Sequence, residues 1–486
     1  MSNPHPQPHP HSHPHPAEDA PRTPNTPPGR HTWTLLVLLC LAQFMLVLDV
    51  TVVNVALPSM AADLGLGRTA LTWVVTAYAL CFGGLMLLGG RLADVFGARR
   101  TLLTGLALFT AASLLTGLAP NAAALIAGRT AQGVGAALLS PAALAILTTT
   151  FEGPARHRAL GVWAAIGGAG SAIGVLLGGL LTDGPGWEWI FYVNVPIGAA
   201  LLLALPALVA ARTPRPARLD VPGALLVTAG TGALIYGLVA AGDSGWSDAR
   251  TLLPVAAAVV VYGAFVAVER AHRSPLIDLR ILRRRPVVAG AYLMLVATAL
   301  LISLFFLGSV YLQEVRGFSA LRTGVLFLPV AVATGLGAHL GGHFVGRAGA
   351  RPTAAVGLAL AALGTGALTT VGADGDAWVS VAPGLSFAAL GLGSVFVAAT
   401  TTALGFITHE EAGIASGLVN TFHEVGGSVG VAVVSTVAAP GIAHGSTASF
   451  GNAFTVCAVA AAASASAVFV IVPRGTPRMT GGPHVH

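Results

Sequence analysis

The sequence predicts an all-α membrane protein with fourteen transmembrane helices, and three observations support this fold class. Hydrophobic residues make up 55% of the 486 residues and charged residues only 9%, whereas a soluble domain carries roughly 25% charged residues. The mean hydropathy is +0.78. Nearly all of the chain falls into apolar stretches of about 20 residues, the length with which a helix crosses a hydrocarbon core.

These apolar stretches follow one another along the chain without the short alternating strands of a membrane β-barrel. They cover approximately residues 33 to 57, 70 to 90, 101 to 119, 123 to 147, 159 to 181, 189 to 211, 221 to 241, 251 to 269, 287 to 312, 323 to 346, 353 to 372, 379 to 405, 413 to 436 and 451 to 473.

The basic residues are distributed unequally between the two sides of the predicted membrane protein. All 25 are arginines. With the N-terminus in the cytoplasm, 20 of them lie on the cytoplasmic side and four, Arg68, Arg250, Arg316 and Arg322, lie outside. Arg129 falls within a span. Because arginines near helix ends resist translocation, we expect a multi-pass protein of a bacterial inner membrane with both termini in the cytoplasm.

The spans divide the chain into five parts. Residues 1–32 alternate proline with histidine and predict a disordered cytoplasmic tail. Residues 33–211 form an N-terminal six-helix bundle, 212–286 a linker with two extra transmembrane helices, 287–473 a C-terminal six-helix bundle, and 474–486 a second tail. The tail histidines could bind a transition metal weakly, but proline alternation prevents a fixed ligand geometry, so we expect no metal site.

An internal repeat supports the two bundles. The stretch "GGRLADVFGARR", residues 89–100, follows the second span, and "GGHFVGRAGARP", residues 341–352, follows the tenth. The two copies are eight spans apart. If six-helix halves are duplicated, the seventh and eighth spans are the additional pair between them.

Five motifs in chain order give the sequence a family resemblance. They are "LDVTVVNVALP" (48–58), "GRLADVFGARR" (90–100), "GRTAQGVGAALLSPAALAI" (128–146), "GSAIGVLLGGLL" (170–181) and "WEWIFYVNVPIG" (187–198). The chain from about 33 to 473 resembles the major facilitator superfamily, specifically its fourteen-helix drug:proton antiporters. Two positions depart from that pattern: Val175 replaces a proline in the fifth helix, and Glu188 replaces an arginine between Trp187 and Trp189.

Asp49 and Arg129 are the candidate proton-coupling residues. Asp49 lies 16 residues into the first span, about 24 Å from the cytoplasmic surface, and Arg129 lies about 20 Å from it. Charged groups at such depth are costly unless they are paired or face water. The resemblance implies that Arg129 couples proton movement to substrate movement. The alternatives are a structural hydrogen bond for Asp49 and an Arg129 side chain that extends to the outer surface.

The loop after the second span is a candidate gate. The residues concerned are Gly90, Arg91, Asp94, Gly97, Arg99 and Arg100. Glycines here allow a tight turn and close helix approach. The resemblance implies a latch that holds the two halves in the outward-facing state. The alternative is a purely topological loop anchored by its arginines.

Other candidates lie within the spans. In the fifth helix, Gly170, Gly174, Gly178 and Gly179 are expected to pack closely against neighbouring helices and seal the central cavity. Glu424 lies near the membrane midplane, next to His423, and either binds substrate, carries a second proton or is structural. Candidate polar residues around the substrate are Asn54, Gln132, Asn194 and Asn420, each of which could instead bond a neighbouring helix.

These features favour a transporter over an enzyme. Clustered carboxylates for a metal are missing from the spans, and so is the phosphate-binding loop of an ATPase. We therefore expect proton-coupled export of hydrophobic drugs or antibiotics by a monomer, with protons, substrates and lipid as partners. No cofactor and no nucleic acid are expected. An uptake facilitator or symporter of the same fold remains the alternative.

Overall fold

A computed structural model describes residues 30–151, 153–209, 220–271, 283–372, 376–404, 412–440 and 447–474. Within these ranges, each of the fourteen predicted spans contains a helix. The helices of the N-terminal half are α1 (Arg30–Leu64), α2 (Arg68–Phe96), α3 (Ala98–Gly117), α4 (Ala122–Thr150), α5 (Gly153–Asp183), α6 (Trp189–Tyr192) and α7 (Asn194–Leu208). Two further helices follow, α8 (Val221–Ser244) and α9 (Ala249–Ala271).

The C-terminal half repeats this arrangement. Its elements are α10 (Arg285–Val310), the π-helix η2 (Tyr311–Val315), α11 (Ala320–Ala348), α12 (Ala350–Ala367), α13 (Ala377–Ser380), α14 (Ala382–Leu404), α15 (Ala412–Val437) and α17 (Thr447–Ile471). Most of the predicted N-terminal tail, the segment 210–219 and the C-terminal tail lie outside the described residues.

Length and apolarity make this a multi-pass membrane protein. In the described ranges, 11 helices are long and apolar enough to cross a membrane. The helices α12 and α15 fall outside that set, and in α5 only Ile173–Asp183 qualifies, as a shorter apolar helix. The all-helical fold class predicted from the sequence is confirmed.

The packing of the helices follows the internal repeat. In the N-terminal half α1 packs on α5, α2 and α3 pack on α4, and α3 packs on α7. The corresponding pairs in the C-terminal half are α10 with α15, α11 and α12 with α14, and α12 with α17. The halves meet through α2 with α15 and through α5 with α11. Helices of the two halves therefore make corresponding contacts.

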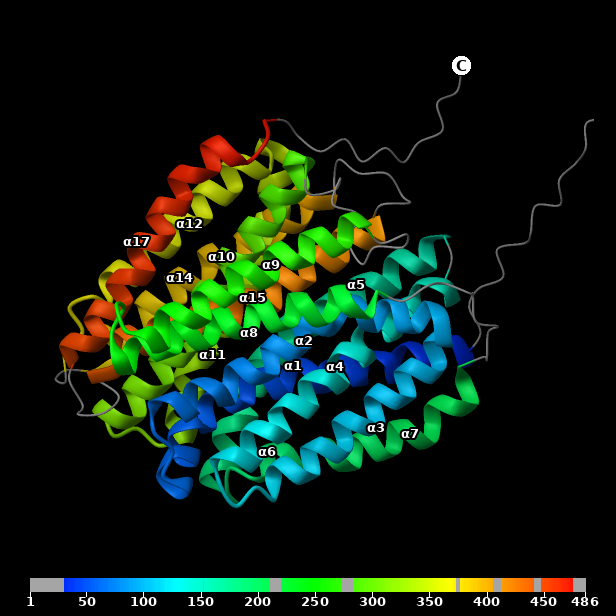
Figure 1. The fold of residues 1–486 in the computed structure, drawn as a ribbon, viewed down its shortest axis with the longest axis horizontal. Coiled ribbons are helices and arrows are strands. Elements are labelled where there is room, and N and C mark those ends of the chain that lie inside the picture. The colour runs from blue at the N-terminus through cyan, green and yellow to red at the C-terminus, as the bar shows by residue number, and fades with distance from the viewer. Residues whose placement is uncertain are drawn as a thin grey trace, which may run out of the picture.

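The two additional helices lie along the junction between the halves. Figure 1 shows α8 and α9 in green between the blue and cyan helices of one half and the yellow to red helices of the other. They pack on each other, and α8 also contacts α2 and α15. Arg68 Nη2 donates to the Val239 carbonyl at 3.1 Å, and Thr436 Oγ1 donates to the Leu238 carbonyl at 2.9 Å. The end of α8 is thus bonded to both halves.

Glycine forms the turn in each copy of the repeated loop. Gly97, between α2 and α3, has φ +93°, and Gly349, between α11 and α12, has φ +91°. Residues with a Cβ rarely adopt such values, so both positions favour glycine. Gly89 serves close packing instead, because a Cβ there would lie 1.9 Å from the Ala137 carbonyl oxygen of α4.

The bundle has two ends, which we call the tail face, where α1 begins and α17 ends, and the opposite face. Polar contacts join the halves toward the opposite face. Gln313 Nε2 donates to the Val55 carbonyl at 2.8 Å, and Thr72 Oγ1 donates to Ser435 Oγ at 2.9 Å. The Asp183 carboxylate at the end of α5 accepts two backbone N–H groups at the start of α11, each at 2.9 Å. Toward the tail face, Leu336, Leu340 and Phe344 of α11 are exposed.

Candidate functional site

A buried ion pair lies in the interior of the N-terminal half. Asp49 of α1 and Arg129 of α4 are each only 1% exposed. Arg129 Nη1 donates to Asp49 Oδ2 at 2.5 Å. Their similar predicted depth is consistent with this contact, because each helix residue advances about 1.5 Å along the axis. The pairing compensates two charges that would each be costly alone in a membrane interior.

Amide side chains complete the network around the carboxylate. Gln132 Nε2 donates to Asp49 Oδ1 at 3.1 Å and to Ser113 Oγ of α3 at 2.8 Å. Asn194 of α7 donates to the same Asp49 oxygen at 3.3 Å. Gln132 Oε1 accepts from Arg129 Nη1 at 3.0 Å. Helices α1, α4 and α7 therefore meet at one carboxylate that accepts three donors, and α3 joins the network through Gln132.

The guanidinium of Arg129 is held on its other sides by α2 and the α6 segment. Its Nε donates to the Val74 carbonyl at 3.1 Å. The Tyr78 ring lies 4.2 Å and the Phe191 ring 5.9 Å from Cζ, both within the range of cation–π attraction. Arg129 is thus fixed by an anion, an amide, a backbone carbonyl and two aromatic faces.

Three of the candidate polar residues around the substrate, Asn54, Gln132 and Asn194, are inaccessible in this structure. Gln132 is fully buried in the network, and Asn54 is 1% exposed, with its amide nitrogen donating to the Val50 carbonyl at 2.8 Å. The Asn54 Oδ1 atom has no hydrogen-bond partner among the described residues. The side chain of Asn420 lies outside the described residues. None of the three could contact a substrate without a change of conformation.

Glu424 and His423 lie on α15 in more accessible surroundings. The His423 side chain is 42% exposed and that of Glu424 is 13% exposed. His423 Nδ1 shares a hydrogen bond with Thr298 Oγ1 at 2.9 Å, and its Nε2 is 3.9 Å from Glu424 Oε1. Glu424 packs against α2, because a Cβ at Gly83 would lie 2.3 Å from the Glu424 Cβ. Sequence position alone did not show that this acid lies at the junction of the two halves.

Comparison with known proteins decides the family. The profile of the Major Facilitator Superfamily matches residues 39–431, which include the N-terminal half, the additional helices and most of the C-terminal half. The chain belongs to the Major Facilitator Superfamily.

Proteins named for antibiotic resistance or export resemble the chain over most of its length. It is 40% identical to the puromycin resistance protein pur8 of Streptomyces alboniger, over 85% of this chain and 82% of that protein. It is 39% identical to the cephamycin export protein CmcT of Amycolatopsis lactamdurans, over 94% of this chain and 96% of that protein. The tetracenomycin C resistance and export protein of Streptomyces glaucescens is 35% identical over 84% of this chain and 76% of its own length.

Solved structures agree with the superfamily fold. A bacterial homologue of the human lysosomal transporter Spinster, in an inward-facing and occupied conformation, matches with a TM-score of 0.65 at 15% identity, over 91% of this chain and 97% of that chain. The peptide transporter POT in complex with sulfate matches with a TM-score of 0.63 at 17% identity, over 90% of this chain and 96% of that chain. At these identities the likeness concerns the fold alone.

In this superfamily member one arginine at the turn between α2 and α3 is bonded within its own half. Arg99 Nη2 donates to the Pro206 carbonyl at the end of α7 at 2.8 Å, whereas Arg100 is exposed. In the C-terminal copy, Arg351 lies 5.2 Å from the Phe469 ring of α17. The side chain of Asp94 lies outside the described residues, so its role as a latch stays a prediction.

The glycines of the fifth helix contact two different helices. A Cβ at Gly170, Gly174 or Gly178 would lie 1.9 to 3.0 Å from atoms of α1, and one at Gly179 would lie 2.7 Å from the Ala320 oxygen of α11. Spacing by four residues places the first three on one face, which allows α5 to contact α1 closely. Gly179 extends the same close packing to the other half of the superfamily fold.

Ser113 and Tyr78 of the network were not singled out by sequence reasoning. Ser113 and Tyr78 gave no signal, because a serine or tyrosine within a span is common. Gln132 was predicted as a candidate substrate contact, although its position three residues after Arg129, on the same helix face, is also that of a partner in the network. Asn194 was recognised as polar but not as a partner of Asp49.

Proposed function

We propose that this protein exports hydrophobic drugs or antibiotics across the bacterial inner membrane in exchange for protons. Its membership of a transporter superfamily and the resistance or export functions named for its relatives support this assignment. The arginine bias supports an orientation with the tail face in the cytoplasm. In that orientation the halves are joined at the outer side, as in an inward-facing transporter.

The observation that carries proton coupling is the buried network of Asp49 and Arg129. In the ionised state the carboxylate and the guanidinium compensate each other at 2.5 Å. Addition of a proton to an Asp49 oxygen removes the anion, whereas the guanidinium keeps its charge. The network then holds an uncompensated buried cation, which is unfavourable by several kcal/mol.

Relief of that charge links the proton to movement. Arg129 can regain favourable surroundings only by reaching water or another acceptor, which requires α1 and α4 to shift. Because α1 packs on α5, and α4 packs on α2 and α3, the shift changes the packing of the N-terminal half. Protonation of Asp49 thereby favours a second conformation of the bundle, the thermodynamic requirement for exchange by alternating access.

Substrate binding is proposed near Glu424 and His423, where side chains are accessible between the halves. A partly exposed carboxylate there favours substrates that combine an apolar body with a positive charge. One polypeptide is sufficient for this mechanism, because the proton network and Glu424 belong to the same chain. The gating loop and the α5 glycines act in this scheme on the equilibrium between the two conformations.

Everted membrane vesicles test the proposal. The initial substrate panel consists of four compounds that appear in the names of its relatives: puromycin, cephamycin, lincomycin and tetracenomycin C. We expect at least one of them to release protons from an acid-loaded lumen and to accumulate inside. A facilitator would leave lumenal pH unchanged, and a symporter would move both species in one direction. Either result would reject proton-coupled export.

A further inference from the structure

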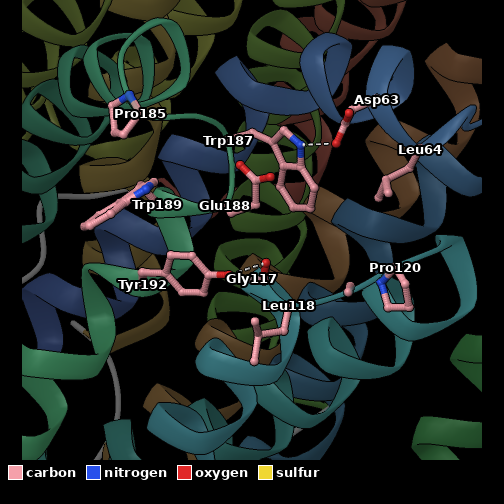
Figure 2. Close-up of a pocket in the computed structure, with 11 residues that line it drawn as sticks. Asp63, Leu64, Gly117, Leu118, Pro120, Pro185, Trp187, Glu188, Trp189 and Tyr192 are labelled. Atoms are coloured by element: carbon pink, nitrogen blue, oxygen red, sulfur yellow. Dashed lines mark hydrogen bonds between the residues drawn. The ribbon is translucent and has the colours of Figure 1, made fainter.

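A cavity separate from the buried network opens at the opposite face of the N-terminal half. It has a volume of ≈450 Å³ and forms where the end of α1, the α3–α4 connection and the α5–α6 connection meet (Figure 2). Its polar and aromatic lining consists of Asp63, Trp187, Glu188, Trp189 and Tyr192. None of the lining residues is an arginine, so this cavity is acidic and aromatic in a chain that is basic overall.

Hydrogen bonds hold the walls of this cavity in place. Trp187 Nε1 donates to Asp63 Oδ2 at 3.0 Å, and the Tyr192 hydroxyl donates to the Gly117 carbonyl at 2.8 Å (Figure 2). Trp189 and Tyr192 also contact each other edge to face, with ring centroids 5.9 Å apart. The aromatic rings are therefore already ordered, and a ligand would not have to restrict them on binding.

Glu188 is the exception in this bonded wall. Within the part of the chain that the structure describes, its carboxylate has no hydrogen-bond or ion-pair partner. The carboxylate oxygen Oε2 lies against Gly186, whose φ of +121° forms the turn beneath it. The turn thus holds the unpaired Glu188 carboxylate at the cavity, on the residue between Trp187 and Trp189 in the sequence.

We propose that this cavity binds an organic ammonium cation with apolar substituents. Aromatic faces attract such a cation through the ring quadrupole, and a carboxylate supplies the opposite charge. A divalent metal ion fits less well, because it needs six or more oxygen ligands or a cluster of His, Cys and acidic side chains. The described residues contain no group of three or more such side chains that could hold a metal. The site does not depend on the proton exchange proposed above.

The cavity is also in contact with the surroundings of Arg129. Trp187 packs edge to face on Phe191 at 6.3 Å, and Phe191 lies 5.9 Å from the Arg129 guanidinium. A ligand that displaces the Trp187 ring would therefore change the packing next to the buried ion pair. This physical contact gives the cavity a route by which an external cation could influence the network.

Ligand-observed NMR on the purified full-length protein tests the site. The probe is benzyltrimethylammonium, and the matched neutral compound is neopentylbenzene, which has the same shape without the charge. We expect line broadening of the cation's methyl signal and at least about tenfold weaker binding of the neutral compound, because only the cation is attracted by the carboxylates that line the cavity. Equal affinity for both compounds, or no binding of the cation, would overturn the proposal.

Variants locate the binding. Glu188→Gln is expected to weaken cation binding at least about fivefold, Glu188→Arg to abolish it, and Glu188→Asp to retain most of it. Glu314→Gln, which changes an exposed acid at the same face in the other half, is the control and should bind like the parent. Gel filtration identifies any misfolded variant. Binding that survives Glu188→Arg in folded protein would place the cation elsewhere and overturn the proposal. That result would not bear on proton-coupled export, which the vesicle assays test separately.

Discussion

Replacement of Asp49 by asparagine tests the buried network most directly. The change removes the anion that accepts Arg129 at 2.5 Å and leaves the guanidinium at 1% exposure without a counter-charge. Removal of one partner from a buried ion pair destabilises proteins by about 3–5 kcal/mol. The asparagine amide would also place a donor next to Gln132 and Asn194, which donate to the present carboxylate.

A second substitution separates stability from transport. Asp49→Asn combined with Arg129→Gln removes both charges, so the double variant should regain much of the stability lost in the single variant. Unfolding in mixed micelles of rising SDS fraction measures the free energy of unfolding of the parent and the variants. We expect neither variant to build a substrate gradient in everted vesicles, because neither can exchange a proton at position 49.

Two results would refute this reasoning. If Asp49→Asn is as stable as the double variant, Arg129 does not depend on Asp49 for compensation. If Asp49→Asn still accumulates substrate against a gradient, the proton path lies elsewhere. The half-buried acid Asp248, in the turn between α8 and α9, provides the control, since Asp248→Asn should match the parent in both measurements.

Three further substitutions test the remaining sites. Glu424→Gln should lower export of cations such as ethidium at least about fivefold and spare neutral compounds. Impaired export of both classes would indicate that Glu424 is a second proton site, and unchanged export would indicate that it is a structural residue. Gly89→Ala should destabilise the α2–α4 contact by about 1–3 kcal/mol, because the added Cβ would lie 1.9 Å from a backbone oxygen. The control is Gly90→Ala, whose added Cβ would have its nearest contact at 3.8 Å. Equal melting temperatures of the two variants would contradict the packing argument. Asp183→Asn should weaken the cap on α11 by about 0.3–1 kcal/mol and lengthen spin-label distances between α5 and α11 at the opposite face; unchanged distances would show that this cap does not hold the halves together.

The sequence was sufficient for the positions of the helices and for the repeat, because both depend on local properties. Span length and apolarity are read from consecutive residues, and each of the fourteen predicted spans contains a helix within the described ranges. The turn glycine Gly97 was likewise readable from its motif. The depth of Asp49 and Arg129 followed from the constant rise of a helix, which is why their proximity could be anticipated.

Only the tertiary structure decided which side chains meet at that depth. A transmembrane helix that is apolar on every side has no amphipathic face, so its rotation about its own axis cannot be read from the sequence. The contacts of Ser113, Asn194 and Tyr78 with the network depend on that rotation in α3, α7 and α2. The burial of Gln132, the junction position of Glu424 and the cavity at Glu188 likewise arise where helices from distant parts of the chain pack together.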